Sequence, residues 1–266
     1  MKRMEHKFFK ACAMTILGLI AVLLIVQPVL AEETSTEGWK FSANIYGWLP
    51  DIKADLVNEG QVEITLKDII NNLDFTFMGG LAARKGKLSL LVDVVYMKLD
   101  HNTNSTVGQI PDFLRLSLNN VQMTSWIVTP VVAYTVLETE HVNLDILTGL
   151  SYFYLKNELE FKLQTPAMTE KFSESASNGY WNGLVGVKGN VLLNEKWYLP
   201  FSGNVGTGDT DLNWEVFGGV GYKFAKLDLV AGYRHMQWDF DSGDTGGEVF
   251  KNLRVSGPLV GVRYYF

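Results

Sequence analysis

The sequence ends with the stretch that decides the fold, Pro258-Leu259-Val260-Gly261-Val262-Arg263-Tyr264-Tyr265-Phe266. Counting back from the end, every second side chain is apolar or aromatic: Phe266, Tyr264, Val262 and Val260. The positions between them, Tyr265, Arg263 and Gly261, form a mixed and polar face. This alternation is typical of a strand in a membrane β-barrel, where one face meets lipid and the other faces the lumen.

The same alternation recurs along the rest of the chain, in segments of the length that a tilted strand needs to cross a bilayer, about 10 residues. It predicts an all-β fold, a transmembrane antiparallel up-and-down β-barrel of about ten strands. The expected strands cover residues 39–49, 74–84, 88–98, a segment ending near 136, and then 142–155, 180–191, 197–205, 212–224, 227–239 and 258–266.

The connections between the expected strands alternate between tight turns and long polar stretches, which we interpret as loops at 50–73, 99–113, 156–178 and 240–249. Short periplasmic turns and long outer loops are a property of outer-membrane barrels, and they predict that both termini are periplasmic. A hairpin within 53–66 would raise the strand number to twelve. Residues 66–73 have helical spacing and could cap the outer mouth or pack as loop.

The N-terminus has the pattern of a secretory signal. Lys2, Arg3, Lys7 and Lys10 precede an apolar run, and Val29-Leu30-Ala31 offers a cleavage site. We therefore expect a cleaved signal peptide at 1–31 and one barrel domain at 32–266; an uncleaved anchor is the alternative. Removal of residues 1–31 takes away four of the 23 Lys and Arg and one of the 29 Asp and Glu, which leaves a net charge of −9.

The remaining chain contains no cysteine, because Cys12 is the only one in the sequence. Disulfides and thiolate metal sites are therefore excluded from the expected barrel. Its net negative charge argues against a nucleic-acid partner. We expect no cofactor and no metal: the carboxylates Asp239, Asp241 and Asp244 do not have the spacing of a defined calcium loop.

Two resemblances support the location. The terminal aromatic strand, with Val260, Val262, Tyr264 and Phe266, resembles the assembly signal of bacterial outer-membrane barrels. The order Asp211-Leu212-Asn213-Trp214, Gly219-Val220-Gly221-Tyr222-Lys223-Phe224, Ala231-Gly232-Tyr233-Arg234, Asp239-Phe240-Asp241 and Ser256-Gly257-Pro258-Leu259-Val260-Gly261 is similar to a family of largely uncharacterised outer-membrane barrels. That family implies fold and location but no reaction.

Charged residues of both signs are expected on the lumen face. The candidates are Asp93, Glu215, Arg234, Lys188, Asp145, Lys223, Asp228 and Arg263, with Asp93, Glu215 and Arg234 nearest the middle. Charges in a narrow barrel need partners, since an unpaired buried charge is costly. One interpretation is a paired network that fills the lumen and closes it. The other is a constriction that selects small polar or anionic solutes.

Aromatic residues near the strand ends are expected to form two interfacial girdles. One would contain Trp48, Trp181, Trp214, Trp238, Tyr96, Tyr152 and Tyr154, and the other Trp39, Trp197, Tyr222, Phe224 and Phe266. Residues at the outer rim, His101, His235, Asp239 and Asp241, could serve a hydrolase of the omptin type or a lipid-modifying one, because a histidine beside a carboxylate can act as a general base. None of the expected omptin motifs is present, so no enzymatic activity is predicted.

The sequence therefore favours a narrow, porin-like channel for small solutes in the bacterial cell outer membrane. A closed barrel that acts through its extracellular loops is the alternative, and a rim hydrolase is the third. The expected partners are outer-membrane lipid and lipopolysaccharide, the barrel-assembly machinery and, for a channel, a small polar solute.

Overall fold

The computed structural model describes residues 38–56, 61–110, 114–164, 169–240 and 250–266. The chain divides into two units, 1–37 and 38–266, and the second is the subject here. The predicted signal peptide and Asp241 lie outside the described residues. Among these residues, no helix is long and apolar enough to cross a membrane.

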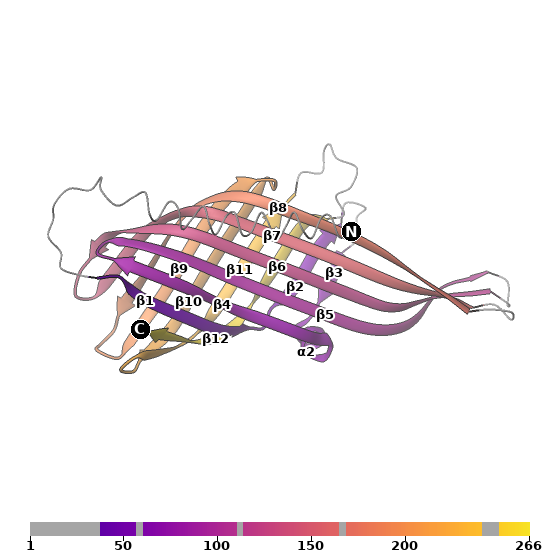
Figure 1. Cartoon of the computed structure of the whole chain (residues 1–266), viewed down its shortest axis with the longest axis horizontal. Coiled ribbons are helices and arrows are strands. Elements are labelled where there is room, and N and C mark those ends of the chain that lie inside the picture. The colour runs from indigo at the N-terminus through magenta and orange to yellow at the C-terminus, as the bar shows by residue number, and fades with distance from the viewer. Residues whose placement is uncertain (1–37, 57–60, 111–113, 165–168, 241–249) are drawn as a thin grey trace. The chain divides into compact units, whose positions relative to one another are not determined.

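Ten strands pair antiparallel in sequence order and close into a barrel, because β1 pairs with both β4 and β12 (Figure 1). The predicted all-β barrel is confirmed. The barrel strands are β1 (Lys40–Trp48), β4 (Leu73–Lys85), β5 (Leu88–Ile110), β6 (Leu114–Glu138), β7 (Val142–Gln164), β8 (Thr169–Leu192), β9 (Trp197–Gly208), β10 (Leu212–Lys223), β11 (Leu227–Asp239) and β12 (Phe250–Tyr265).

The two ends of the barrel differ. At one end, which we call the short-turn end, tight connections join β4 to β5, β6 to β7, β8 to β9 and β10 to β11. The turn between β4 and β5 uses Gly86 at φ 55°, a conformation that glycine adopts without steric cost. At the opposite end, which we call the long-hairpin end, β5 and β6, and β7 and β8, run on together before they turn.

The stretches 99–113 and 156–178 were predicted to be loops, and this prediction is wrong for the described residues 99–110, 156–164 and 169–178. The ladder continues through them, with Asp100 opposite Gln122 and Lys156 opposite Ser177. Figure 1 shows the four strands β5 to β8 extending together far past the others. Backbone hydrogen bonds with a neighbouring strand form whatever the side chains are, so these polar-rich stretches extend the strands. The alternation of Leu159, Phe161 and Leu163 with charged residues was the signal for a strand that the loop interpretation passed over.

An apolar belt covers the outside of the barrel towards the short-turn end. Outward side chains there remain widely exposed in the isolated barrel, as for Ile45 at 61%, Leu81 at 60% and Val260 at 64%. Aromatic contacts mark its two borders: Tyr96 with Trp126 and Tyr152 with Trp181 at one, Trp197 with Tyr222 and Tyr264 with Phe266 at the other. A belt between two aromatic girdles is the surface that a bilayer covers.

The polarity of both faces inverts along the strands. On β5, Val95, Met97 and Leu99 are buried inside the barrel, whereas the outward Lys98 forms an ion pair with Asp74. On β11, Met236 and Trp238 are likewise buried inside. Towards the long-hairpin end the barrel is therefore built like a water-soluble protein, with an apolar interior and a polar exterior.

Two aromatic residues correct the girdle prediction. Trp48 is 3% exposed and Trp238 is 1% exposed, and both belong to the apolar interior rather than to a lipid-facing girdle. Trp48 has the same alternation parity as Tyr46, which was assigned to the lumen face. The parity of the strand therefore outweighs the general preference of tryptophan for the membrane interface.

A small subdomain completes the apolar interior. The hairpin β2 (Asp51–Leu56) and β3 (Gln61–Ile64) continues the sheet from β12, so the full sheet has twelve strands while ten close the barrel. The helix α2 (Leu66–Asn72) follows, with Thr65 and Asp68 forming a capping box. Ile69 of α2 is only 1% exposed and packs into the core cluster. Both lie in the stretch 50–73 that was interpreted as a loop; the hairpin is the one that was left open as the way to twelve strands, and the helix is one of the two interpretations given for residues 66–73.

Candidate functional site in the lumen

A charged network crosses the lumen at the level where the polarity inverts. Arg234 of β11 lies with Nη1 3.1 Å from Asp93 Oδ2 of β5 and with Nε 2.9 Å from Glu215 Oε1 of β10. The Arg234 side chain is 6% exposed, Glu215 is 12% and Asp93 is 31% exposed. The structure thus brings together the three residues that were expected nearest the middle. Because each is charged and shielded, the network is stable only when it is complete.

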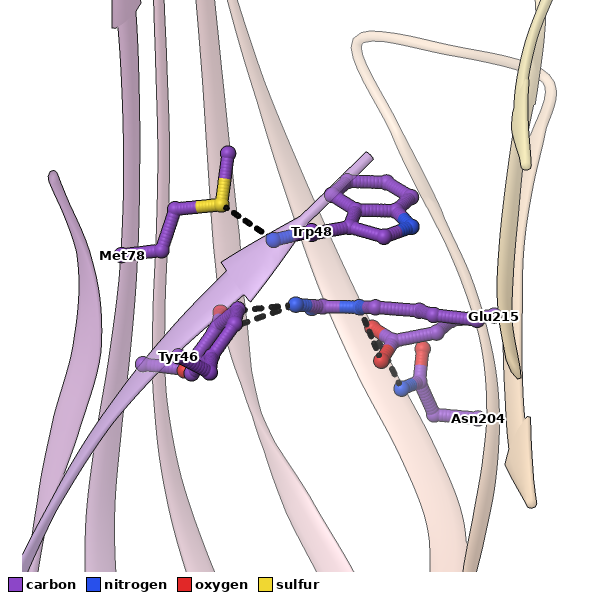
Figure 2. Close-up of polar contacts among 7 residues, drawn as sticks. Tyr46, Trp48, Met78, Asn204 and Glu215 are labelled. Atoms are coloured by element: carbon purple, nitrogen blue, oxygen red, sulfur yellow. Dashed lines mark hydrogen bonds and ion pairs between the residues drawn. The ribbon is translucent and has the colours of Figure 1, made fainter. Parts of the chain in front are cut away.

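Tyr46 of β1 joins Arg234 to Asp93. Its hydroxyl accepts a hydrogen bond from Arg234 Nη1 at 2.9 Å and lies 2.8 Å from Asp93 Oδ2, to which it donates. Figure 2 shows Tyr46 and Glu215 on opposite sides of the lumen, with Trp48 on the side of the network away from Tyr46. The Trp48 ring lies 5.2 Å from the Arg234 guanidinium. Strands distant in sequence are thereby tied together across a narrow interior.

Trp48 separates the network from the apolar interior. Its indole Nε1 donates to the backbone oxygen of Gly257 at 3.2 Å, and its backbone nitrogen lies 3.3 Å from Met78 Sδ (Figure 2). Beyond it lie Val95, Met97, Ile127, Phe153, Met236 and Trp238, all in one buried cluster. The described side chains therefore fill the lumen on the long-hairpin side of Arg234.

Towards the short-turn end, a second polar contact joins β6, β7 and β8. Asp145 is 3% exposed and accepts a hydrogen bond from Thr135 Oγ1 at 2.7 Å. Lys188 Nζ lies 3.4 Å from the other carboxylate oxygen of Asp145. Both predicted lumen residues, Asp145 and Lys188, thus face inward and pair with each other.

A third polar contact lies nearest the short-turn end. Asp228 accepts hydrogen bonds from the hydroxyl groups of Tyr198 at 2.9 Å and Tyr265 at 2.8 Å. The Tyr198 ring fits because position 221 is glycine: a Cβ there would lie 2.2 Å from the ring. Lys223 Nζ lies 5.5 Å from the centre of the same ring. Arg263 is directly opposite Asp228 in the β11–β12 register.

Two cavities occupy the lumen between the Arg234 network and the short-turn end. The larger is about 490 Å³ and is lined by Asp93, Glu215 and Arg234 at one limit and by Arg263 and Tyr265 at the other. The smaller is about 230 Å³, and Glu138 and Thr139 of the short turn contribute to its lining. We call the two together the vestibule. Charged residues lie at both limits of the larger cavity with apolar residues between them, and the apolar interior lies beyond Arg234.

The rim candidates are not brought together. His235 stacks on Trp214 with ring centres 4.5 Å apart, so it lies on the outer wall, and Asp239 accepts a hydrogen bond from Gln237 at 2.8 Å. His101 is in β5, opposite Val121, well before the end of that strand. β5 and β11 are not neighbours in the sheet. The described residues contain no group of three or more His, Cys, Asp or Glu suited to a metal ion.

The residues of the proposed assembly signal all face outward. Val260, Val262, Tyr264 and Phe266 are 64%, 39%, 43% and 74% exposed. The backbone nitrogen of Phe266 donates to Phe41 at 3.0 Å, so the last residue takes part in closing the barrel.

Sequence reasoning missed two features of the lumen. One is the pair of tyrosines that donate hydrogen bonds to the lumen carboxylates, and the other is the apolar interior. Tyr46 and Tyr198 were assigned to the inner face, but nothing in the sequence gives their distances to Asp93 and Asp228. The apolar interior could have been predicted from a change in side-chain polarity along one strand. Along β5 the inward positions change from Ser89 and Asp93 to Val95 and Met97, while the outward positions change from Tyr96 to Lys98.

No protein-family model matches the chain, and no curated protein matches it in sequence. Solved barrels resemble it at low identity. The translocator domain of autotransporter NalP from Neisseria meningitidis is 16% identical with a TM-score of 0.43, each chain being covered to 96%. Ail, the attachment invasion locus protein of Yersinia pestis, is 11% identical with a TM-score of 0.35, covering 87% of this chain and 100% of Ail.

The toluene transporter TodX of P. putida is 9% identical with a TM-score of 0.36, and the match covers 87% of this chain and 90% of TodX. These proteins differ in role, and the values are too low to transfer any function to this chain. The fold assignment rests on the strand pairing and on the apolar belt described above.

Proposed function

We propose that this protein resides in the bacterial outer membrane, with the short-turn end and both termini in the periplasm and residues 1–31 removed on export. The apolar belt and its two aromatic girdles support a bilayer around the half of the barrel that holds the vestibule. The outward residues of β12 would be read by the barrel-assembly machinery. The polar wall beyond the belt would stand among lipopolysaccharide headgroups and in the external medium.

Within this class, we propose a closed barrel that acts by binding a partner outside the cell. One observation carries the proposal: β5 to β8 continue beyond the other strands as a four-stranded extension of the sheet. We call this part the distal sheet; it comprises residues 100–110, 114–124, 155–164 and 169–180. A pore needs no such extension, and the buried apolar cluster of Trp48, Phe153 and Trp238 lies across the lumen among the described residues, which supports a closed barrel.

The distal sheet has two unpaired edges. Pairing of β4 with β5 ends at Leu99, and pairing of β8 with β9 ends at Asn182. Along β8, the residues from Ser173 to Gly179 are exposed and small or polar, without proline. Natural edge strands are usually blocked by lysine, proline or bulges, and an open edge is a template for another extended chain. The proposed partner is therefore a protein that adds a strand.

The test removes the distal sheet while keeping the barrel register. Deleting 102–120 and 158–175, and joining each hairpin by Asn-Gly, connects positions that are already opposite each other. Cells that display the complete protein should aggregate or adhere to surfaces more than cells that display the trimmed barrel. Equal adhesion, with both proteins folded and displayed at the same level, would refute the binding role.

A gated, narrow channel is the second candidate, and the vestibule is the observation that favours it. A cavity of about 490 Å³, lined in part by charged residues, reaches the Arg234 network from the short-turn side. Conduction would require Arg234 to release Asp93 and the apolar cluster to move. For this candidate, single-channel current steps must be seen, and their size must change in Asp93→Ala.

We propose no enzymatic role. A hydrolytic activity of the purified protein that disappears in His235→Ala would contradict this proposal.

A further inference from the structure

The two cavities of the vestibule share five lining residues: Arg84, Asn143, Asn190, Arg263 and Tyr265. Residues that line both cavities lie where the cavities meet, so we call these five the junction ring. They come from β4, β7, β8 and β12, and they therefore surround the lumen rather than cover one wall. A solute entering from the short-turn end would meet this ring before it reached the Arg234 network.

The chemistry of the junction ring is that of an anion site. Two guanidinium groups and two carboxamides can donate hydrogen bonds, the phenol of Tyr265 already donates to Asp228, and no carboxylate lines both cavities. Lys188 lines the larger cavity and Lys223 the smaller. The two cavities together are lined by six Lys or Arg side chains and five carboxylates, so the junction ring is the part of the lining that has guanidinium groups and no carboxylate.

The neighbouring carboxylates already have partners. Asp228 accepts from Tyr198 and Tyr265, Asp145 accepts from Thr135 and pairs with Lys188, and Glu138 lies 3.3 Å from Arg84. Asp145 and Glu138 are therefore paired with Lys188 and Arg84, and Asp228 is the carboxylate whose charge acts on Arg263. Donor hydrogens of the ring that these groups do not accept need acceptors from a ligand or from water.

Two donors of the ring remain available. Asn143 Nδ2 is buried and has no hydrogen-bond partner among the described residues. Arg263 takes part in none of the ion pairs of 4.0 Å or less found among the same residues; its guanidinium is hydrogen-bonded to the Tyr265 side chain and interacts with Tyr198 and Asp228, which leaves further N–H groups to donate. A buried donor without a partner is costly, and a guanidinium presents a fork that matches carboxylate and phosphate oxygens.

We propose that the junction ring binds a small oxyanion, a carboxylate or a phosphate, through Arg263 and Asn143. The site does not depend on the binding role of the distal sheet, and it needs no passage through the apolar interior. Its ligand would enter from the short-turn end, where Glu138 and Thr139 line the smaller cavity.

The test follows the side-chain amide of Asn143 by NMR in the exported protein, purified in detergent and titrated with inorganic phosphate or with acetate against a chloride reference. A saturable shift of Asn143 is expected, with no shift of Asn204, which already donates to Glu215 at 3.4 Å. Saturation by phosphate alone, or by acetate alone, supports the site and identifies the anion. Absence of a saturable shift with both anions overturns it.

Variants separate binding from folding. Asn143→Asp places a negative charge in the ring. Arg263→Lys keeps the positive charge but loses the planar guanidinium that donates two parallel hydrogen bonds. Each variant should weaken the affinity for the anion by about tenfold or more. Lys98→Met removes a cation on the outer wall, where it pairs with Asp74, and should leave the affinity unchanged. Equal weakening by all three would show an unspecific charge effect and would refute the site. The wild-type titration remains decisive if one variant fails to fold.

Discussion

Arg234 Nε lies 2.9 Å from Glu215 Oε1, and this ion pair marks the level at which the barrel interior changes from polar to apolar. On one side lies the vestibule, and on the other the side chains of Met236 and Trp238 are buried. The exterior changes in the opposite sense at nearly the same level. One continuous set of strands is therefore adapted to two solvents, lipid around its polar half and water around its apolar half.

Removal of the cation should destabilise the barrel more than removal of the whole network. In Arg234→Ala, Asp93 and Glu215 keep their charges without a partner, and the free energy of unfolding should fall by about 3–5 kcal/mol. In the triple variant Asp93→Asn, Glu215→Gln, Arg234→Met, most of this loss should be recovered. Urea unfolding in detergent measures both. A triple variant as unstable as Arg234→Ala would contradict a charge-based explanation.

The apolar interior should behave as a packed core. The Trp238 side chain is 1% exposed and stacks on Phe153 with ring centres 4.8 Å apart. Trp238→Ala should therefore lower the free energy of unfolding by about 3–5 kcal/mol. Trp214→Ala is the matched control on the outer wall, where lipid or detergent can fill the space. Its cost should be clearly smaller. Equal losses in the urea midpoint, followed by circular dichroism, would show that the interior is not tightly packed.

The position of the bilayer can be tested with two arginines on the same face of β6. Val132 is 44% exposed within the apolar belt. Val132→Arg should make folding into a lipid bilayer less favourable by about 2–4 kcal/mol, because it places a charge against the lipid. Gln122 lies outside the belt between Asp100 and Glu158, so Gln122→Arg should be tolerated. Folding yield into vesicles is the measurement. Comparable losses at both positions would place the bilayer over the polar wall and refute the assignment.

The hairpin β2–β3 should loosen in acid. Arg254 Nη2 lies 2.6 Å from Asp55 Oδ2, and this hydrogen bond holds the pKa of Asp55 below its usual value of 3.8. The ion pair therefore stabilises the folded hairpin above the pKa of Asp55 in the unfolded chain, and the effect is lost as the pH falls through the lowered pKa. Amide exchange over 51–56 should increase at the lower pH. Asp55→Asn should exchange fast at both pH values.

The sequence predicted the barrel and its closing strand because period-2 alternation is strong wherever one face meets lipid, as from Leu88 to Tyr96. It failed on the distal sheet, where the alternation of Leu159, Phe161 and Leu163 with charged residues on β7 is short and was assigned to a loop. It also misplaced Trp48, since the preference of tryptophan for interfaces was given more weight than the parity of the strand.

The site was only partly predictable. Alternation assigns Asp93, Glu215 and Arg234 to the lumen face one by one, yet their distances depend on the stagger between strands, which a single sequence does not encode. The partners of Asp228 show the same limit. Tyr198 reaches it only because Gly221 leaves room for the ring, and the two positions become neighbours through the β9–β10 register.

The central claim is that the lumen is closed on the long-hairpin side of Arg234, and single-channel conductance of the exported protein in a planar bilayer tests it most directly. We expect a folded, heat-modifiable barrel that gives no discrete current steps, because Trp48, Trp238 and their neighbours fill the interior. Reproducible steps of one size, with the same folded barrel, would contradict the account and establish a channel.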